Sequence, residues 1–200
     1  GHDIVLTNML YGAILRTEHP TAEFTIDISE AIKLPGVVCV LTADDTDTNN
    51  ISYKRDHPIL KKGEVNCIRD EIAAVAAETE EIAVAACKLI RVMYKPIKPF
   101  FEIDESLYDI GEEEKIHAHT KFHNNIHKKA ELHFGNREEG FQQSAFRSKM
   151  NFEFEGVTHA FTEPHAATAY WDENGLTIYT ATQVPHYLHR ALAKVLHLPL

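Results

Sequence analysis

Residues 67–94, CIRDEIAAVAAETEEIAVAACKLIRVMY, decide the fold class of the chain. We predict the first eleven, CIRDEIAAVAA, to be a strand despite their alanines. Glu78-Thr79-Glu80-Glu81 then begins an amphipathic helix, because acidic residues in a first turn complement the helix dipole. Its apolar face, read from helical spacing, consists of Ile82, Ala85, Ala86, Leu89 and Ile90. Residues 91–94 return as a strand, so the stretch is a strand–helix–strand unit.

A similar unit precedes it in the chain. Residues 9–16 and 23–27 are rich in aromatic and β-branched residues and predict two strands. Ser29 is the expected N-cap of a short helix that ends at Pro35-Gly36. Residues 37–42, VVCVLT, form a continuous apolar run, which is typical of a strand buried on both faces. The two units together predict an α/β (α+β) domain up to about residue 103.

Residues 104–149 have a different character and predict an extended linker. The stretch contains an acidic run at 112–114 and a short helix candidate near 138–144. Its histidines follow no apolar period. Three of them lie four residues apart, so on a helix they would share one face and could bind a transition metal: His119, His123 and His127. Asn124-Asn125 interrupts this run, and no nearby cysteine or carboxylate completes a ligand set. A solvated linker is therefore the preferred interpretation.

Residues 152–200 predict a strand, a sharp turn, two further strands and a helix over about 184–196. Glu163 and His165 could share one face of a strand and act as an acid–base pair, although such pairs more often satisfy buried backbone groups. Thr182 or Gln183 is expected to cap the final helix, with Pro185 in its first turn. A helix start can attract anions, but a cap is the commoner role.

The amino-acid composition is typical of a globular protein and excludes several functional classes. Hydrophobic residues make up 44% of the 200 residues and charged residues 25%, which are ordinary globular values. The net charge of −10 argues against a nucleic-acid or acidic-membrane surface. Cys39, Cys67 and Cys87 show no CxxC spacing, so we expect reduced core residues rather than a zinc or iron–sulfur site. No secretory leader or membrane-length apolar run is seen, so the expected location is cytoplasmic.

Several stretches, in collinear order, resemble the large subunit of the molybdenum hydroxylases, the family of xanthine dehydrogenase, aldehyde oxidase and 4-hydroxybenzoyl-CoA reductase. They are YGAILR (11–16), LPGV (34–37), LTADD (41–45), AAVAAET (73–79), EPHAA (163–167) and TQVPH (182–186). The resemblance implies an α/β-hammerhead domain over 1–105, an extended His-rich linker over 106–150 and the beginning of a molybdopterin-binding domain over 151–200. It also implies hydroxylation with oxygen from water and a molybdopterin cofactor in the complete enzyme.

The sequence departs from the family pattern at three places. Arg69-Asp70-Glu71 stands where the family usually has Gly-Asp/Glu-Pro, and Gly135-Asn136-Arg137 replaces Gly-Asp-Val. The resemblance places Val157, next to Gly156, near the molybdenum, where many members have Gln or Asn. In those members the Gln or Asn side chain is expected to donate a hydrogen bond to the oxo ligand of the metal. Valine cannot donate it, so one electrostatic influence on the metal is lost. Gly156 and Val157 are the candidate cofactor-binding residues, and neither a catalytic residue nor a metal ligand is assigned.

The resemblance also places the family's Gly-Gly-Gly-Phe-Gly loop and its catalytic glutamate beyond Leu200. The leading hypothesis is therefore an N-terminal fragment or split piece of a molybdenum-dependent oxidoreductase, scaffolding the cofactor domain and inactive alone. Expected partners are the remainder of the molybdopterin subunit and the subunits or domains that carry iron–sulfur clusters and FAD, with no nucleic acid and no membrane. Exposed strand edges also predict a possible homo-oligomer. The alternatives are a non-catalytic assembly module that keeps the hammerhead fold and a His-rich metal-binding protein.

Overall fold

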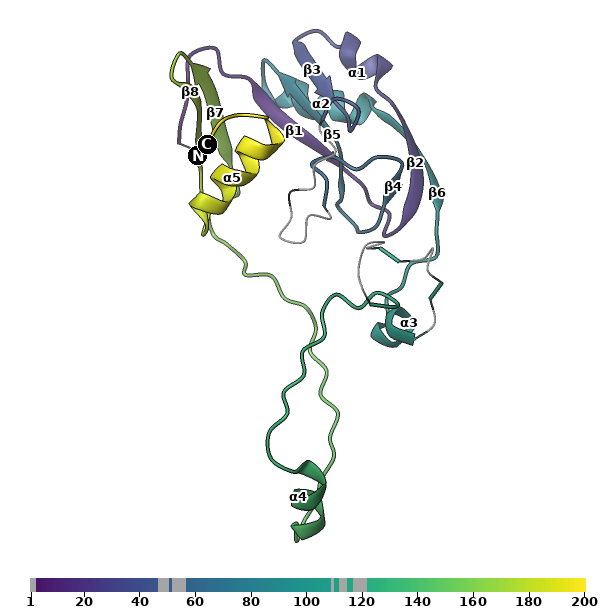
Figure 1. Cartoon of the computed structure of the whole chain (residues 1–200). Helices are drawn as coiled ribbons and strands as arrows, with labels where there is room; N and C mark the ends of the chain where they lie inside the picture. Colours follow the sequence, from purple (N-terminus) through teal and green to yellow (C-terminus); the bar gives the residue numbers. More distant parts are fainter. Residues whose placement is uncertain (1–2, 47–50, 52–56, 109, 112–114, 117–121) are drawn as a thin grey trace.

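The computed structural model describes residues 3–46, 51, 57–108, 110–111, 115–116 and 122–200, and its first half consists of two antiparallel sheets with two helices (Figure 1). One sheet has the order β1 (Tyr11–Arg16), β5 (Glu71–Ala77), β3 (Val37–Leu41), and the other β4 (Glu64–Val65), β2 (Ala22–Asp27), β6 (Arg91–Pro96). Helices α1 (Ser29–Lys33) and α2 (Glu80–Leu89) pack against each other and against the first sheet. The predicted mixed α/β fold class is confirmed.

Strand β5 is the centre of this half and has a packed layer on each face. Ala73, Val75 and Ala77 belong to the core shared with α2, where small side chains let the helix approach the sheet. Ile72 points to the other face and packs with Phe24 and Val65 of the second sheet. The alanines that made this strand uncertain from sequence are what allow close packing on the helix side.

The prediction that residues 37–42 are buried on both faces is wrong. Strand β3 pairs only with β5 and forms an edge of its sheet. Val40 is buried against the helices, whereas 57% of Val38 is exposed. A continuous apolar run is typical of a strand buried on both faces, but β3 lies at the edge of its sheet, and the alanine-rich β5 occupies the centre.

Helix α2 forms where predicted, but its buried face is rotated relative to the prediction. The buried residues are Ala83, Ala86 and Cys87, followed by Ile90, whereas Ala85 and Leu89 are exposed. Thr79 caps the helix, because its hydroxyl oxygen accepts a hydrogen bond from the Ile82 N–H at 3.3 Å. Small alanines, which a hydrophobicity pattern ranks below leucine, lie against the sheet because they allow the closest approach.

The start of α1 differs from the prediction by one residue. Ser29 is the first residue of the helix rather than its N-cap, and Ile28 in the cap position makes no side-chain cap. Instead, Asp27 Oδ1 accepts a hydrogen bond from the Ser29 N–H at 2.9 Å, and this bond lowers the pKa of the Asp27 carboxyl. At the other end Gly36 has a φ of +87°, and a Cβ there would lie 2.7 Å from Ile82 Cδ1. The left-handed φ and the close approach of Ile82 both favour glycine at this turn.

The turn before β5 contains one of the departures from the family pattern. Arg69 has a φ of +74°, in the left-handed region that favours glycine, and it stands where the family usually has Gly. The turn is held by backbone bonds from the Arg69 N–H to the Thr17 carbonyl (2.8 Å) and from the Thr17 N–H to the Asp70 carbonyl (3.0 Å). The predicted strand over 67–77 accordingly begins at Glu71, after this turn.

The expectation that all three cysteines lie in the core holds only for Cys87. Cys39 and Cys67 are exposed, and all three are free thiols. Burial raises the pKa of the Cys87 thiol, because the charged thiolate is poorly solvated between helix α2 and the sheet.

The second half of the chain is less compact. It contains α3 (Ile103–Tyr108), α4 (Arg137–Gln143), the hairpin β7 (Ala167–Asp172) and β8 (Gly175–Thr180), and α5 (Pro185–Val195). Every residue from 127 to 165 is exposed; this segment, here called the arm, runs away from the body of the molecule, carries α4 at its far end and returns to β7 (Figure 1). The predicted short helix near 138–144 is confirmed by α4. The strand predicted from residue 152 is wrong, since residues 144–166 contain no strand.

Candidate functional site

Gly156 and Val157, the candidate cofactor-binding residues, lie in the returning limb of the arm. The Val157 side chain is 90% exposed. A Cβ added at Gly156 would meet nothing within 4 Å. Within the described part of the chain, therefore, no wall of side chains surrounds these two residues. Taken alone, they do not fit a molybdopterin, which needs an enclosed set of polar contacts.

Glu163 and His165 follow shortly after and do not form the acid–base pair considered from sequence. The described chain shows no hydrogen bond or ion pair between them. The His165 ring instead lies edge-on to Phe161, with centroids 5.0 Å apart, and Phe161 stacks on His159 at 5.6 Å. These rings cover one another along an exposed segment, so the geometry supports a packing role for His165 rather than proton transfer.

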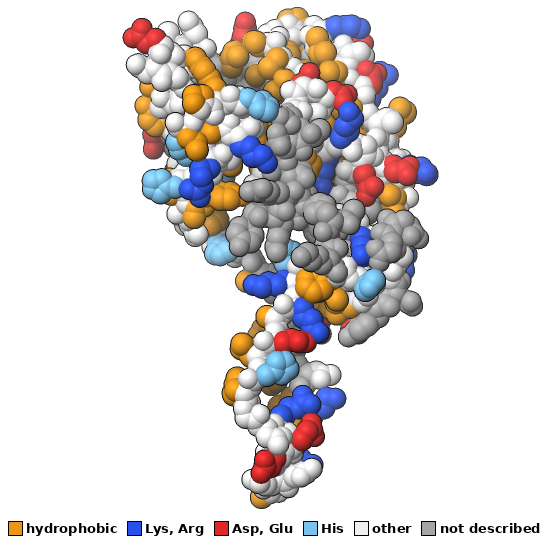
Figure 2. Space-filling view, in the orientation of Figure 1, with side chains coloured by type: hydrophobic (Ala, Val, Ile, Leu, Met, Phe, Trp, Pro, Cys, Tyr) orange, Lys and Arg blue, Asp and Glu red, His pale blue; other side chains and the backbone are white. Residues whose placement is uncertain are grey.

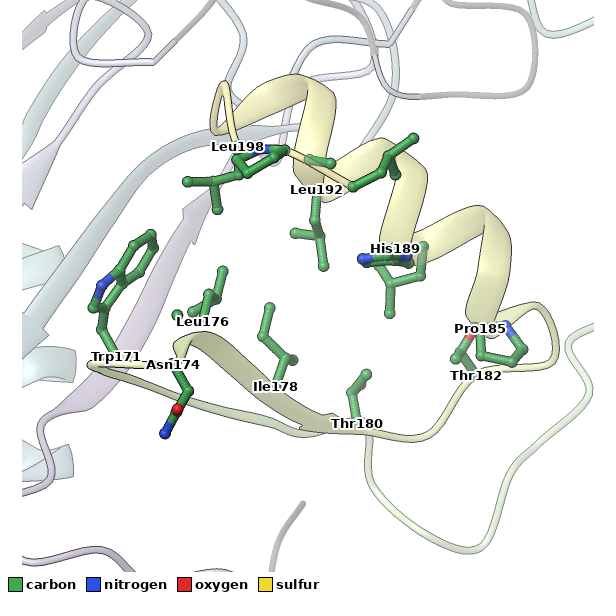
Figure 3. Close-up of a pocket in the computed structure, with 15 residues that line it drawn as sticks. Trp171, Asn174, Leu176, Ile178, Thr180, Thr182, Pro185, His189, Leu192 and Leu198 are labelled. Atoms are coloured by element: carbon green, nitrogen blue, oxygen red, sulfur yellow. The ribbon is translucent and has the colours of Figure 1, made fainter.

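A cavity of about 620 Å³, here called the hollow, lies between the β7–β8 hairpin and α5 (Figure 3). Leu176 and Ile178 of β8 point into it from one side, and Leu188 and Leu192 of α5 line the other. Trp171 and Leu198 stand at one end, and Thr182 and Pro185 stand at the other. The lining is mostly apolar, with Asn174, Thr180, Thr182 and His189 as its polar side chains, and no Asp, Glu, Lys or Arg is among the described lining residues. The hollow therefore suits apolar side chains rather than a highly charged ligand.

The residues of β8 alternate between the two faces of the strand, a pattern that is visible in the sequence. Leu176, Ile178 and Thr180 lie at every second position and line the hollow, whereas Tyr179 lies on the other face, beside Tyr170. The two rings are 6.2 Å apart, and a hydrogen bond between the two side chains raises the pKa of Tyr179. A period-two pattern of this kind identifies the inward face of a strand, and it would have identified this wall.

The start of α5 differs from the prediction in its cap. Val184 is the N-cap residue and has no side-chain cap, while Pro185 occupies the first turn as expected. Thr182 instead fixes the backbone just before the helix, because its hydroxyl oxygen accepts a hydrogen bond from the Val184 N–H at 3.2 Å. Gln183 is exposed. The Tyr187 hydroxyl donates to the Ile51 carbonyl at 2.7 Å, which links α5 to the first half of the chain.

His123 and His127 do not share a helix face, as the metal site considered from sequence assumed. His119 lies outside the described residues. His123 and His127 are exposed, and residues 122–127 are not helical, so the four-residue spacing does not place them on one face.

No described helix is long and apolar enough to cross a membrane.

Comparison with known families assigns both halves of the chain. Residues 1–98 match the a/b hammerhead domain of aldehyde oxidase and xanthine dehydrogenase, and residues 116–200 match the molybdopterin cofactor-binding domain. The chain belongs to the molybdenum hydroxylase family. It contains the hammerhead domain and the start of the molybdopterin-binding domain of the large subunit.

Individual members of the molybdenum hydroxylases resemble this chain over nearly its whole length. The nicotinate dehydrogenase large molybdopterin subunit of Eubacterium barkeri is 31% identical over 98% of the chain, and a probable xanthine dehydrogenase subunit of Bacillus subtilis (strain 168) is 33% identical over 98%. The crystal structure of quinoline 2-oxidoreductase from Pseudomonas putida 86 has the same fold, with a TM-score of 0.84 at 24% identity over 99% of the chain. The chain spans 46%, 26% and 26% of these three proteins.

Proposed function

We propose that the chain is a structural part of a molybdenum-dependent oxidoreductase, scaffolding the cofactor domain and inactive by itself. The observation that carries this proposal is the hollow. Its walls, from β8 and α5, are mostly apolar, and the described residues leave its centre unfilled (Figure 3). Protein interiors pack densely, so such walls need side chains between them.

The arm supports the same conclusion. Its apolar side chains are largely exposed: Leu132, Phe134, Phe146, Met150, Phe152, Phe154, Val157 and Phe161. Hydrophobic side chains can be seen along the protruding part of the surface in Figure 2. Apolar surface on this scale marks an interaction site. We propose that the remainder of a large subunit covers the arm and fills the hollow, with molybdopterin held at the resulting interface.

Copurification tests this proposal. When the 200-residue chain is coexpressed with a separate polypeptide that supplies the remainder of a large subunit, we expect the two to elute as one complex. Ile178→Asp places a carboxylate in the hollow and is expected to reduce complex formation at least tenfold, because a buried unpaired charge is strongly unfavourable. Thr177→Asp, the next residue of β8 and outside the hollow, is the matched control. Equal binding by both variants would contradict the proposal.

We further propose that Gly156 and Val157 face the molybdenum cofactor in the assembled enzyme. The support is their position in the returning limb, close before the hairpin that lines the hollow, and the family match of this region. Val157→Gln would restore an amide donor there and is expected to shift the molybdenum(V) electron paramagnetic resonance signal. Val5→Gln, which changes an exposed valine of the hammerhead domain, should leave the signal unchanged. An unaltered signal in Val157→Gln would place this residue away from the metal.

The domain boundaries at 105 and 150 are part of the proposal. So are partners that carry iron–sulfur clusters and FAD, which would accept electrons from the molybdenum. Self-association through the open edges of the β7–β8 hairpin is expected for the chain without its partners, because unpaired strand edges template pairing.

A further inference from the structure

A second group of potential metal ligands lies in the hammerhead domain and has no role in the function proposed above. It consists of Asp70 and Glu71, at the beginning of β5, and of His57, which precedes them in the chain. One ligand atom from each residue lies within 4.8 Å of the other two. His57 Nε2 is 3.5 Å from Glu71 Oε2. Two ligands about 2.1 Å from a tetrahedral ion are separated by roughly 3.4 Å, so this pair already has the spacing that zinc requires.

Both carboxylates are fixed in position by other groups. Asp70 is 6% exposed, and its Oδ2 accepts hydrogen bonds from the backbone N–H groups of Asn66 (2.8 Å) and Cys67 (3.1 Å). Glu71 contacts Arg16 Nη1 through Oε1 and faces His57 through Oε2. In metal sites, partners of this kind orient the ligating carboxylates and determine much of the affinity.

We propose that His57 Nε2 and one carboxylate oxygen from each of Asp70 and Glu71 bind a divalent transition-metal ion of the zinc type. Imidazole nitrogen and carboxylate oxygen are ligands that zinc accepts, and a water molecule would complete a four-coordinate site. The buried Asp70 forms the floor of the site. The half-exposed His57 side chain leaves the opening through which an ion enters. The ligands lie on the hammerhead domain, so this site does not depend on the molybdopterin proposal.

Two neighbouring cations reduce the affinity of this site without removing it. Lys61 Nζ is 3.4 Å from Asp70 Oδ2, and Arg16 contacts Glu71. Arg16 contacts Glu71 Oε1, which leaves Oε2 for the metal. Lys61 contacts Asp70 Oδ2, which already accepts the two backbone N–H groups, and this leaves Oδ1 for the metal. Their positive charges repel the metal ion, so the affinity is lower than it would be for the same three ligands without these cations.

Calorimetric titration of zinc chloride into the 200-residue chain tests the site, with Co²⁺ absorption reporting the coordination geometry. We expect one ion per chain and at least a tenfold loss of affinity in His57→Ala and in Glu71→Gln. His133→Ala is the matched control, because His133 Nε2 lies 3.8 Å from Glu131 Oε2 without a third ligand among the described residues. It should bind as the unmutated chain does, and so should His123→Ala/His127→Ala.

His57 is a surface residue, so His57→Ala should fold, and circular dichroism verifies this. Absence of stoichiometric binding by the unmutated chain would overturn the proposal. Undiminished binding by His57→Ala would overturn it equally. Loss of binding in the linker variant with retention in His57→Ala would move the metal to the linker histidines.

Discussion

Replacing Ile72 by alanine is expected to lower the free energy of unfolding by about 2–5 kcal/mol. Ile72 is 1% exposed and is among the largest fully buried side chains of the described residues. It lies on the face of β5 that packs on Phe24 and Val65, and thus joins the two sheets of the hammerhead domain. Truncation removes buried methyl groups and leaves a cavity that the surrounding strands cannot fill.

Urea denaturation followed by circular dichroism measures this effect. Ile32→Ala, which truncates an isoleucine that is 54% exposed on α1, is the matched control and should change stability by no more than about 0.5 kcal/mol. Equal effects of the two substitutions would show that β5 is not the centre of the fold.

Replacing Asp70 by alanine is expected to lower the free energy of unfolding by about 3 kcal/mol or more. The substitution removes the acceptor for the Asn66 and Cys67 N–H groups and the partner of Lys61, whose side chain is only 12% exposed. Two backbone donors then lose their acceptor, and the largely buried Lys61 ammonium loses its anionic partner and keeps only the neutral Asn66 Oδ1, at 2.8 Å; each loss is unfavourable. The turn that begins β5 depends on these bonds.

The matched control for Asp70 is an exposed ion pair between the adjacent lysine and another aspartate. Lys62 Nζ lies 2.6 Å from Asp44 Oδ1, with both side chains more than 70% exposed. Asp44→Ala should change stability by no more than about 1 kcal/mol, because water screens the pair and replaces it. Denaturation curves in which Asp70→Ala loses no more than Asp44→Ala would contradict the buried role of Asp70.

The elements of the hammerhead domain could be predicted from sequence where a local pattern determines them. The acidic first turn and apolar spacing of residues 78–90 locate α2, and Pro35-Gly36 marks the end of α1. The layer to which each strand belongs could not be predicted, because it depends on pairing between distant residues. The run VVCVLT is more apolar than EIAAVAA, yet β5 is central because alanine allows α2 to lie close.

The candidate site was predicted only in part, for a related reason. Gly156 and Val157 were located through resemblance to a family, and their own surroundings supply no enclosing contacts among the described residues. The strand predicted from residue 152 does not form, because a strand requires a paired neighbour and the arm has none in the described part of the chain. Asp70 and Glu71 are adjacent, but the third proposed ligand, His57, lies 13 residues before Asp70, so the three form no recognisable metal-binding spacing.

Molybdenum content of the 200-residue chain, expressed alone in a host that makes molybdopterin, tests the central claim most directly. Mass spectrometry of the purified chain should find molybdenum only at background level, because Gly156 and Val157 are exposed and the hollow is apolar. The complex with the remainder of a large subunit should contain the metal. Stoichiometric molybdenum in the chain alone would show that these residues hold the cofactor without further protein, and would contradict the account.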